Sequence, residues 1–246
     1  MAKSQIGYGY GSEWQLLRFM GRHRKELETK IREVIGAKGN FDWLDFEYKD
    51  RRSEITGDNE LLKLDWINRN IIDATNLDSV KNEFKRSKLK INWDAIFIVD
   101  NTIFLVEAKA HKDEFESDCR SKREESKRTI SDFLKKYLDG KADITKDLLN
   151  KHYQFVNRLA TASFLQKSLQ EDGINAKVLY ICFENGFFKQ NVGKNGRKYS
   201  TKDIKDALEK DFRKVIDDEL KALNTTREKI SNIYAGEVYI DAAPKG

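Results

Sequence analysis

Two acidic residues and a lysine stand in neighbouring hydrophobic runs of the chain. Asp94 lies in INWDAIFIV, and Glu107 and Lys109 lie in TIFLVEAKA, with only Asp100 and Asn101 between the two runs. Because Asp and Asn tolerate the left-handed backbone of a tight turn, the two runs are predicted to form an antiparallel hairpin. In that register Asp94 faces Glu107, and Lys109 projects from the same side of the sheet as Glu107.

Such a convergence of charges could bind a divalent metal ion. Like charges opposite each other on neighbouring strands are destabilising, and an unpaired buried charge is more costly still. A hard cation such as Mg²⁺, Mn²⁺ or Ca²⁺ between Asp94 and Glu107 would turn this repulsion into attraction. The alternative is a metal-free ion network in which Lys109 neutralises one of the carboxylates. The spacing favours the metal site but leaves both interpretations open.

The pattern of Asp94 followed thirteen residues later by Glu107-Ala108-Lys109 resembles the signature of the PD-(D/E)xK nuclease superfamily. Three blocks carry the resemblance: YGSEWQLLRFMGRHR, WDAIFIVDNTIFLVEAKAH and YQFVNRLATASFLQ. They look like the landmark blocks of a little-characterised branch of that superfamily, and they occur in the same order. One departure is Trp93, which stands where the signature has a proline.

The resemblance implies an α/β fold with a restriction-endonuclease-like αββαβ core, in which helices flank a mixed central sheet. Residues 1–246 are then expected to form a single domain, and the length is sufficient to bury a substantial core. Residues of about 40–90 would be an insertion between the first helix and the catalytic hairpin. Trp43 and Trp66 in this insertion are interpreted as core residues, with stacking on nucleic-acid bases as the alternative.

The first core helix is predicted to begin at Ser12, which forms a capping-box pattern with Gln15, and to continue until Gly36. Glu13 in its first turn could simply complement the helix dipole. The resemblance implies instead that Glu13 adds a further carboxylate to the metal site, and this is the interpretation that we favour.

A second, amphipathic helix is predicted at about residues 148–171. Gln154 and Arg158 are one turn apart and share a face, as do Tyr153 and Asn157. The resemblance implies that these four polar residues contact a substrate phosphate or the water network of a metal site. A partly exposed helix without a ligand is the alternative.

The remaining elements follow from local patterns. Residues 111–147 are dense in charge with a helix expected in their middle, and His111 and Glu114 directly follow the catalytic strand, where they are candidates for substrate contact. AKVLYICFE (176–184) is predicted to be a buried strand. Residues 201–223 are predicted to form an amphipathic helix, and GEVYIDA a final strand.

Composition narrows the function classes. The chain has 46 Lys and Arg against 41 Asp and Glu, a mild basicity that permits nucleic-acid binding. Cys119 and Cys182 are too far apart in sequence to indicate a disulfide framework or a zinc site. No apolar run suggests a membrane span, so we expect a cytoplasmic protein that does not bind membranes. A Rossmann unit and a GxSxG elbow are both missing from the sequence.

The resemblance implies a Mg²⁺- or Mn²⁺-dependent deoxyribonuclease that hydrolyses DNA phosphodiester bonds. Asp94, Glu107 and Glu13 would hold the metal together with the carbonyl of Ala108, and Lys109 would orient or deprotonate the attacking water. The alternatives are a nucleic-acid-binding module that does not cleave, and a structural protein with a buried ion network. DNA is the expected partner, while the form of the DNA and the pairing of two copies into a homodimer stay open.

Overall fold

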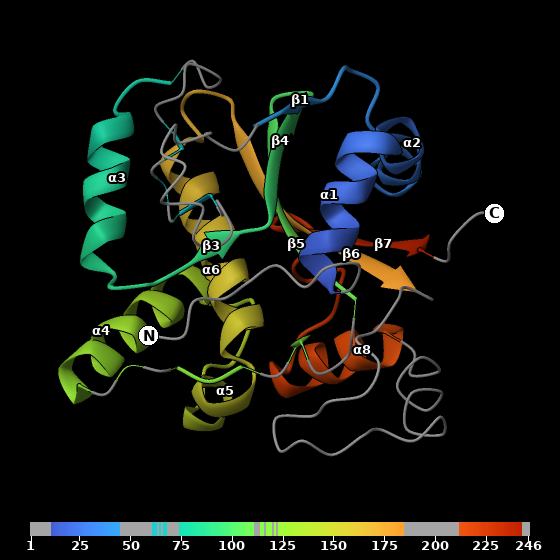
Figure 1. Ribbon diagram of the computed structural model, residues 1–246. Coiled ribbons are helices and arrows are strands. Elements are labelled where there is room, and N and C mark those ends of the chain that lie inside the picture. The colour runs from blue at the N-terminus through green and yellow to red at the C-terminus, as the bar shows by residue number, and fades with distance from the viewer. Residues whose placement is uncertain are drawn as a thin grey trace, which may run out of the picture.

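A mixed β-sheet forms the centre of the protein and is flanked by helices on both faces (Figure 1). The structure, a computed structural model, describes residues 11–44, 61–62, 64, 66–67, 74–110, 114–115, 117–119, 121, 123–184 and 212–242. Within these residues the main sheet has five strands in the order β1-β4-β5-β6-β7, so the expected α/β class is confirmed. The strands are β1 (Asp42–Trp43), β4 (Ala95–Val99), β5 (Thr102–Lys109), β6 (Asn175–Glu184) and β7 (Tyr234–Asp241).

The β4–β5 hairpin has the predicted register. Val99 pairs with Thr102 and Ala95 pairs with Val106, and the two residues of the Asp-Asn turn have φ of 47° and 55°. A left-handed backbone at both turn positions gives the twist that a two-residue hairpin needs. The strand predicted at 176–184 is β6, which runs parallel to β5, and the predicted final strand is β7, parallel to β6.

Two helices, α1 (Ser12–Arg22) and α2 (Arg24–Ile35), cover one face of the sheet (Figure 1). The prediction of one continuous helix is wrong, because the chain breaks at His23 with φ −121°. The break allows α1 to pack on β5 and β6 while α2 packs on β7, which a straight helix could not do on a twisted sheet. The Arg24 side chain donates to the Met20 carbonyl over 2.8 Å at the end of α1.

Both ends of this helical pair depend on a glycine. Gly11, with φ 86°, is the N-cap of α1, so Ser12 is the first helical residue and no side chain caps the helix. The predicted capping box is therefore wrong, and the Gln15 side chain is fully buried instead of turning back to the cap. Gly36 ends α2 in the left-handed conformation, as predicted, and its N–H donates to the Arg32 carbonyl.

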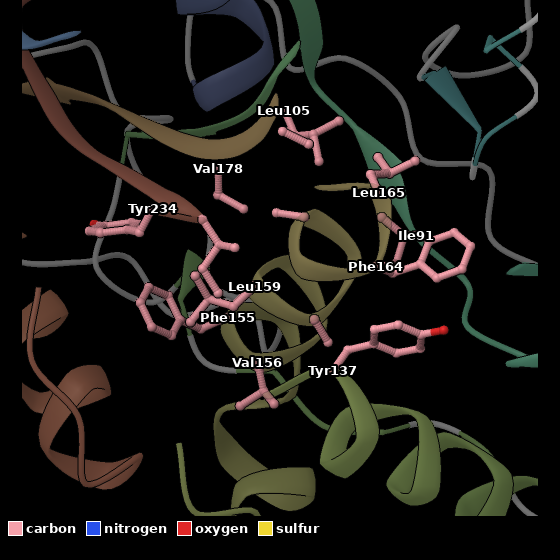
Figure 2. Packing of buried hydrophobic residues seen from close by; sticks show 14 of the residues in the cluster. Ile91, Leu105, Tyr137, Phe155, Val156, Leu159, Phe164, Leu165, Val178 and Tyr234 are labelled. Carbon is pink, nitrogen blue, oxygen red and sulfur yellow. The ribbon is translucent and has the colours of Figure 1, made fainter. Parts of the chain in front are cut away.

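The opposite face is covered by α6, which lies at the centre of a large apolar cluster. In Figure 2, Phe155 and Leu159 of α6 point toward Val178 and Tyr234 of the sheet, and Phe164 lies toward the adjacent helix α4. Every residue of α6 from Phe155 to Leu165 is buried, so the helix has no exposed face along this stretch. The predicted amphipathic pattern is therefore wrong. The helices on this side are α3 (Leu77–Arg86), α4 (Glu124–Leu138), α5 (Lys146–Lys151), α6 (Tyr153–Ser168) and α8 (Phe212–Ala222).

The described parts of the expected insertion, residues 40–90, belong to the main body. Strand β1 pairs with β4 at the edge of the sheet, and β2 (Leu61–Leu62) pairs with β3 (Asn92–Trp93). Trp66 is buried in the same apolar cluster as α6, which agrees with its interpretation as a core residue.

Other parts of the predicted insertion, and residues 201–211 of the predicted helix at 201–223, lie outside the described residues. The rest of that helix forms α8. Among the described residues, no helix is both long and apolar enough to cross a membrane.

Candidate active site

Glu107 and Lys109 are buried on the α6 face of the sheet, at the end of β5. Alternate residues of a strand point to opposite faces, so both side chains lie on the same side as Leu105, away from α1 and α2. Only 2% of Glu107 and 4% of Lys109 is exposed. Lys109 Nζ donates to Glu107 Oε1 over 2.7 Å, which makes a buried ion pair between residues two apart on the strand.

Two side chains of α6 complete this ion pair. Gln154 Nε2 donates to Glu107 Oε1 over 2.6 Å, and Gln154 Oε1 accepts from Lys109 Nζ over 3.0 Å. Arg158 Nε donates to Glu107 Oε2 over 2.8 Å. The prediction that Gln154 and Arg158 share one face of the helix is therefore confirmed. We refer to Glu107, Lys109, Gln154 and Arg158 as the Glu107 network.

Arg158 is fixed by three further contacts. Its Nη2 donates to the Asn92 carbonyl over 2.9 Å, and its Nη1 donates to Asn157 Oδ1 over 3.0 Å. The guanidinium carbon lies 4.9 Å from the centre of the Trp93 ring, within the range of a cation–π interaction. Trp93, the departure from the superfamily signature, thus supports the arginine. Sequence reasoning missed this role and that of the Asn92 carbonyl, because neither is visible from local spacing.

Asp94 lies between β3 and β4, where the hairpin ladder ends. Its Oδ2 accepts from the Ala108 N–H over 2.7 Å, and its own N–H donates to the Val106 carbonyl. Burial and the negative charge of Glu107 raise the pKa of Asp94 to about 8, against the opposing effect of Lys109 and the Ala108 N–H. Without a bound metal ion, Asp94 therefore carries a proton at neutral pH.

Glu107 has the opposite electrostatic balance. Burial by itself would raise the pKa of Glu107, but Arg158 and Lys109 hold this pKa below its ordinary range. Glu107 is consequently ionised at neutral pH. Two buried carboxylates with pKa values moved apart in this way are typical of sites that bind cations or transfer protons.

A cavity of about 1040 Å³ opens beside the Glu107 network. Asp94 and Glu107 both line it, which puts the two predicted acidic residues in contact with one open space. The four residues of α6 that were predicted to bind substrate line the same cavity: Tyr153, Gln154, Asn157 and Arg158.

The segment after β5 also reaches this cavity. Glu114 lines it, and Glu114 Oε2 accepts from the Ala110 N–H over 2.8 Å. Ser117 lines it as well, and its hydroxyl accepts from the Gln154 N–H over 2.6 Å at the start of α6. The link between Ser117 and Gln154 was not predicted, since the two residues are distant in sequence and meet only in the fold.

The structure does not bring Glu13, another predicted metal ligand, into this cluster. Glu13 is on α1, which covers the opposite face of the sheet, and it is half-buried there. Among the described residues, no group of three or more His, Cys, Asp or Glu side chains is arranged to hold a metal ion. His111 lies outside the described residues. Metal binding by Glu13 and by the Ala108 carbonyl stays a prediction.

The donor set of the cavity nevertheless fits one hard divalent cation. Within the part of the chain that the structure describes, only the Ala108 N–H donates to the Asp94 carboxylate, through Oδ2, so Oδ1 remains available. Carboxylate oxygens are the ligands that Mg²⁺ and Mn²⁺ prefer. A divalent cation would also relieve the repulsion from Glu107 that raises the pKa of Asp94.

No protein-family model, curated protein or solved structure matches this chain. The function is therefore inferred from the geometry and charge of the site. Two carboxylates of opposite protonation preference and a buried lysine meet at the end of one hairpin, and all of them lie at or next to one large cavity.

Proposed function

We propose that the protein is a metal-dependent nuclease of the PD-(D/E)xK type, which hydrolyses DNA phosphodiester bonds in the cavity beside the Glu107 network. The observation that carries the proposal is the convergence of Asp94, Glu107 and Lys109 at the end of the β4–β5 hairpin. The succession of helices α1 and α2, hairpin β4–β5, helix α6 and strand β6 supports a restriction-endonuclease-like core.

Asp94 and Glu107 would hold a Mg²⁺ or Mn²⁺ ion. When bound, such an ion supplies a water of lowered pKa and offsets negative charge on the scissile phosphate. Binding of the ion requires Asp94 to lose its proton, so the raised pKa of Asp94 makes metal affinity increase with pH.

Lys109 would contribute electrostatic stabilisation. An ammonium group has three N–H donors, and Lys109 uses two of them on Glu107 and Gln154. The third can donate to a water or to a phosphate oxygen, where a fixed positive charge stabilises the transition state. Gln154 positions this group, because its amide bonds to both Lys109 and Glu107.

A nucleic-acid-binding module that does not cleave is the second candidate function. It is favoured by the charge balance of the Glu107 network, in which Lys109 and Arg158 already neutralise the charge of Glu107 without a metal ion. Both candidate functions use the same cavity for nucleic acid, and they differ in whether Asp94 binds a cation.

Calorimetric titration of Mn²⁺, followed by incubation with plasmid and single-stranded DNA, tests the proposal. The comparison is between wild type, Asp94→Asn, and Asp132→Asn, which removes an exposed carboxylate on α4. We expect saturable Mn²⁺ binding and Mn²⁺-dependent cleavage in wild type and Asp132→Asn, with loss of both in Asp94→Asn. DNA binding without Mn²⁺ binding in the wild type would favour the module that does not cleave.

A further inference from the structure

Four exposed cations line the cavity. Lys85 is in the last turn of α3, Lys88 and Lys90 lie between α3 and β3, and Arg123 immediately precedes α4. We refer to these four residues as the basic rim. Arg123 is distant in sequence from the three lysines, so the fold assembles the rim at this cavity.

Most of the basic rim has no counter-charge in the part of the chain that the structure describes. Among the described residues, Lys85, Lys90 and Arg123 form no ion pair, and Lys88 pairs only with Glu125, across 3.2 Å. Exposed lysines elsewhere do pair with acidic neighbours, at 3.1 Å for Lys30–Glu33, 2.8 Å for Lys127–Glu124 and 3.1 Å for Lys136–Glu83. Uncompensated like charges around a concavity produce a positive potential that attracts an anionic ligand.

The acidic residues of the cavity come from other segments of the chain than the basic rim. Asp94 and Glu107 belong to the hairpin, and Glu114 and Asp118 belong to the segment that follows β5. A ligand that is anionic along its whole length would therefore lie against the rim and approach the carboxylates only where a cation screens them. A volume of about 1040 Å³ is at the upper end of pockets that hold small molecules, which suits a segment of a polymer.

We propose that the basic rim binds the phosphate backbone of a DNA strand, and that it does so without a metal ion. The proposal deepens the proposed function and rests on it for the nature of the polyanion, because the rim would carry the strand whose scissile phosphate faces Asp94. The lysines of KRSKLK, residues 85–90, then form part of the substrate-binding surface. Contacts of this kind provide affinity and orientation without reading base sequence.

The test measures binding of a fluorescent oligonucleotide, single-stranded or duplex, by anisotropy over a range of salt concentrations in EDTA. The rim variant combines Lys85→Ala, Lys90→Ala and Arg123→Ala. The matched control combines Lys25→Ala, Lys135→Ala and Arg22→Ala, which removes as many exposed positive charges away from the cavity. Thermal unfolding of both triple variants establishes that they fold.

We expect the rim variant to bind roughly tenfold more weakly than wild type, while the control stays within about twofold. The slope of log K against log salt concentration should decrease by about 2 on a single strand, or by about 3 on a duplex, because three phosphate contacts are lost. The form of DNA that shows this decrease is the form that the rim holds. Equal weakening in both triple variants, or no binding by the wild type, would overturn the proposal.

Failure of this inference is distinguishable from failure of the proposed function. If the wild type binds DNA through the rim but neither binds Mn²⁺ nor cleaves, the proposal for the rim is retained and the proposed nuclease function is rejected. If the wild type cleaves with Mn²⁺ and the rim variant binds and cleaves like the control, the nuclease function is retained and the proposal for the rim is rejected. Charge reversal with Lys85→Glu and Lys90→Glu should enlarge the loss further if the rim contacts phosphate.

Discussion

The guanidinium of Arg158 donates to Glu107 through Nε over 2.8 Å, and both side chains are almost completely buried. Arg158 is therefore a fixed, buried positive charge next to Glu107. Together with Lys109, Arg158 supplies two positive charges against the two carboxylates of Asp94 and Glu107. A contact of Arg158 with substrate phosphate was predicted from the sequence and stays a prediction, whereas its contact with Glu107 has direct consequences for stability and metal binding.

Arg158→Ala should reduce the free energy of unfolding by about 3–5 kcal/mol, because it leaves Glu107 buried without its main partner. Urea denaturation measures this loss. The control is Lys30→Ala, which breaks the exposed pair with Glu33 and should cost less than about 1 kcal/mol. A loss below 1 kcal/mol for Arg158→Ala would mean that the buried pair does not form in solution.

The stoichiometry of metal binding should be one Mn²⁺ per chain. Among the described residues, Asp94 and Glu107 are the carboxylates that meet at the Glu107 network, and both oxygens of Glu107 already accept hydrogen bonds, so the ligands suffice for one divalent ion and not for two. Calorimetry at pH 8.5, with Asp94 mostly ionised, gives the number of ions bound. Two equivalent tight sites in wild type would contradict the inference and point to carboxylates beyond Asp94 and Glu107.

The parts of the site that the sequence predicted are those fixed by local rules. The Asp-Asn turn sets the hairpin register, which brings Asp94 to the end of the ladder and places Glu107 and Lys109 on one face. Helical spacing likewise put Gln154 and Arg158 on the same side of α6. In both cases a single turn or helix period determines the geometry, so few contacts from elsewhere can change it.

The parts that the sequence did not predict depend on tertiary packing. Helix α6 looked amphipathic, but it packs against both the sheet and α4. Arg158 faces β5 and β3, where it is buried and needs partners. The Asn92 carbonyl and the Trp93 ring provide them from a segment distant in sequence. The break at His23 similarly arises from packing on a twisted sheet, which no local signal encodes.

Gln154→Ala should lower kcat by about tenfold or more with little change in KM. The residue holds Lys109 and Glu107 in their relative orientation, and hydrogen bonds to charged groups are worth about 1.5–3 kcal/mol. Steady-state cleavage of a defined oligonucleotide provides both constants, and Gln170→Ala, an exposed change after α6, is the control. A rise in KM with unchanged kcat would instead assign Gln154 to substrate binding.

The stability of the metal-free protein should depend on pH through Asp94. Burial and Glu107 raise the pKa of this carboxyl from 3.8 to about 8, so the folded state binds its proton more tightly than the unfolded state does. This contribution is complete below about pH 4 and is lost as pH rises through about 8, at up to about 1.4 kcal/mol per pH unit.

Asp94→Asn removes this dependence. In EDTA, the free energy of unfolding of wild type should therefore fall relative to that of Asp94→Asn between about pH 5 and pH 8, as measured by denaturation at each pH. Glu219, whose pKa burial raises to about 7, acts in the same direction in both proteins, and its effect cancels in the difference. Mn²⁺ should restore the stability of wild type at pH 8 and leave Asp94→Asn unchanged, because only an ionised carboxylate binds the cation. Parallel pH curves for the two proteins would show that Asp94 has an ordinary pKa and that Glu107 does not repel it.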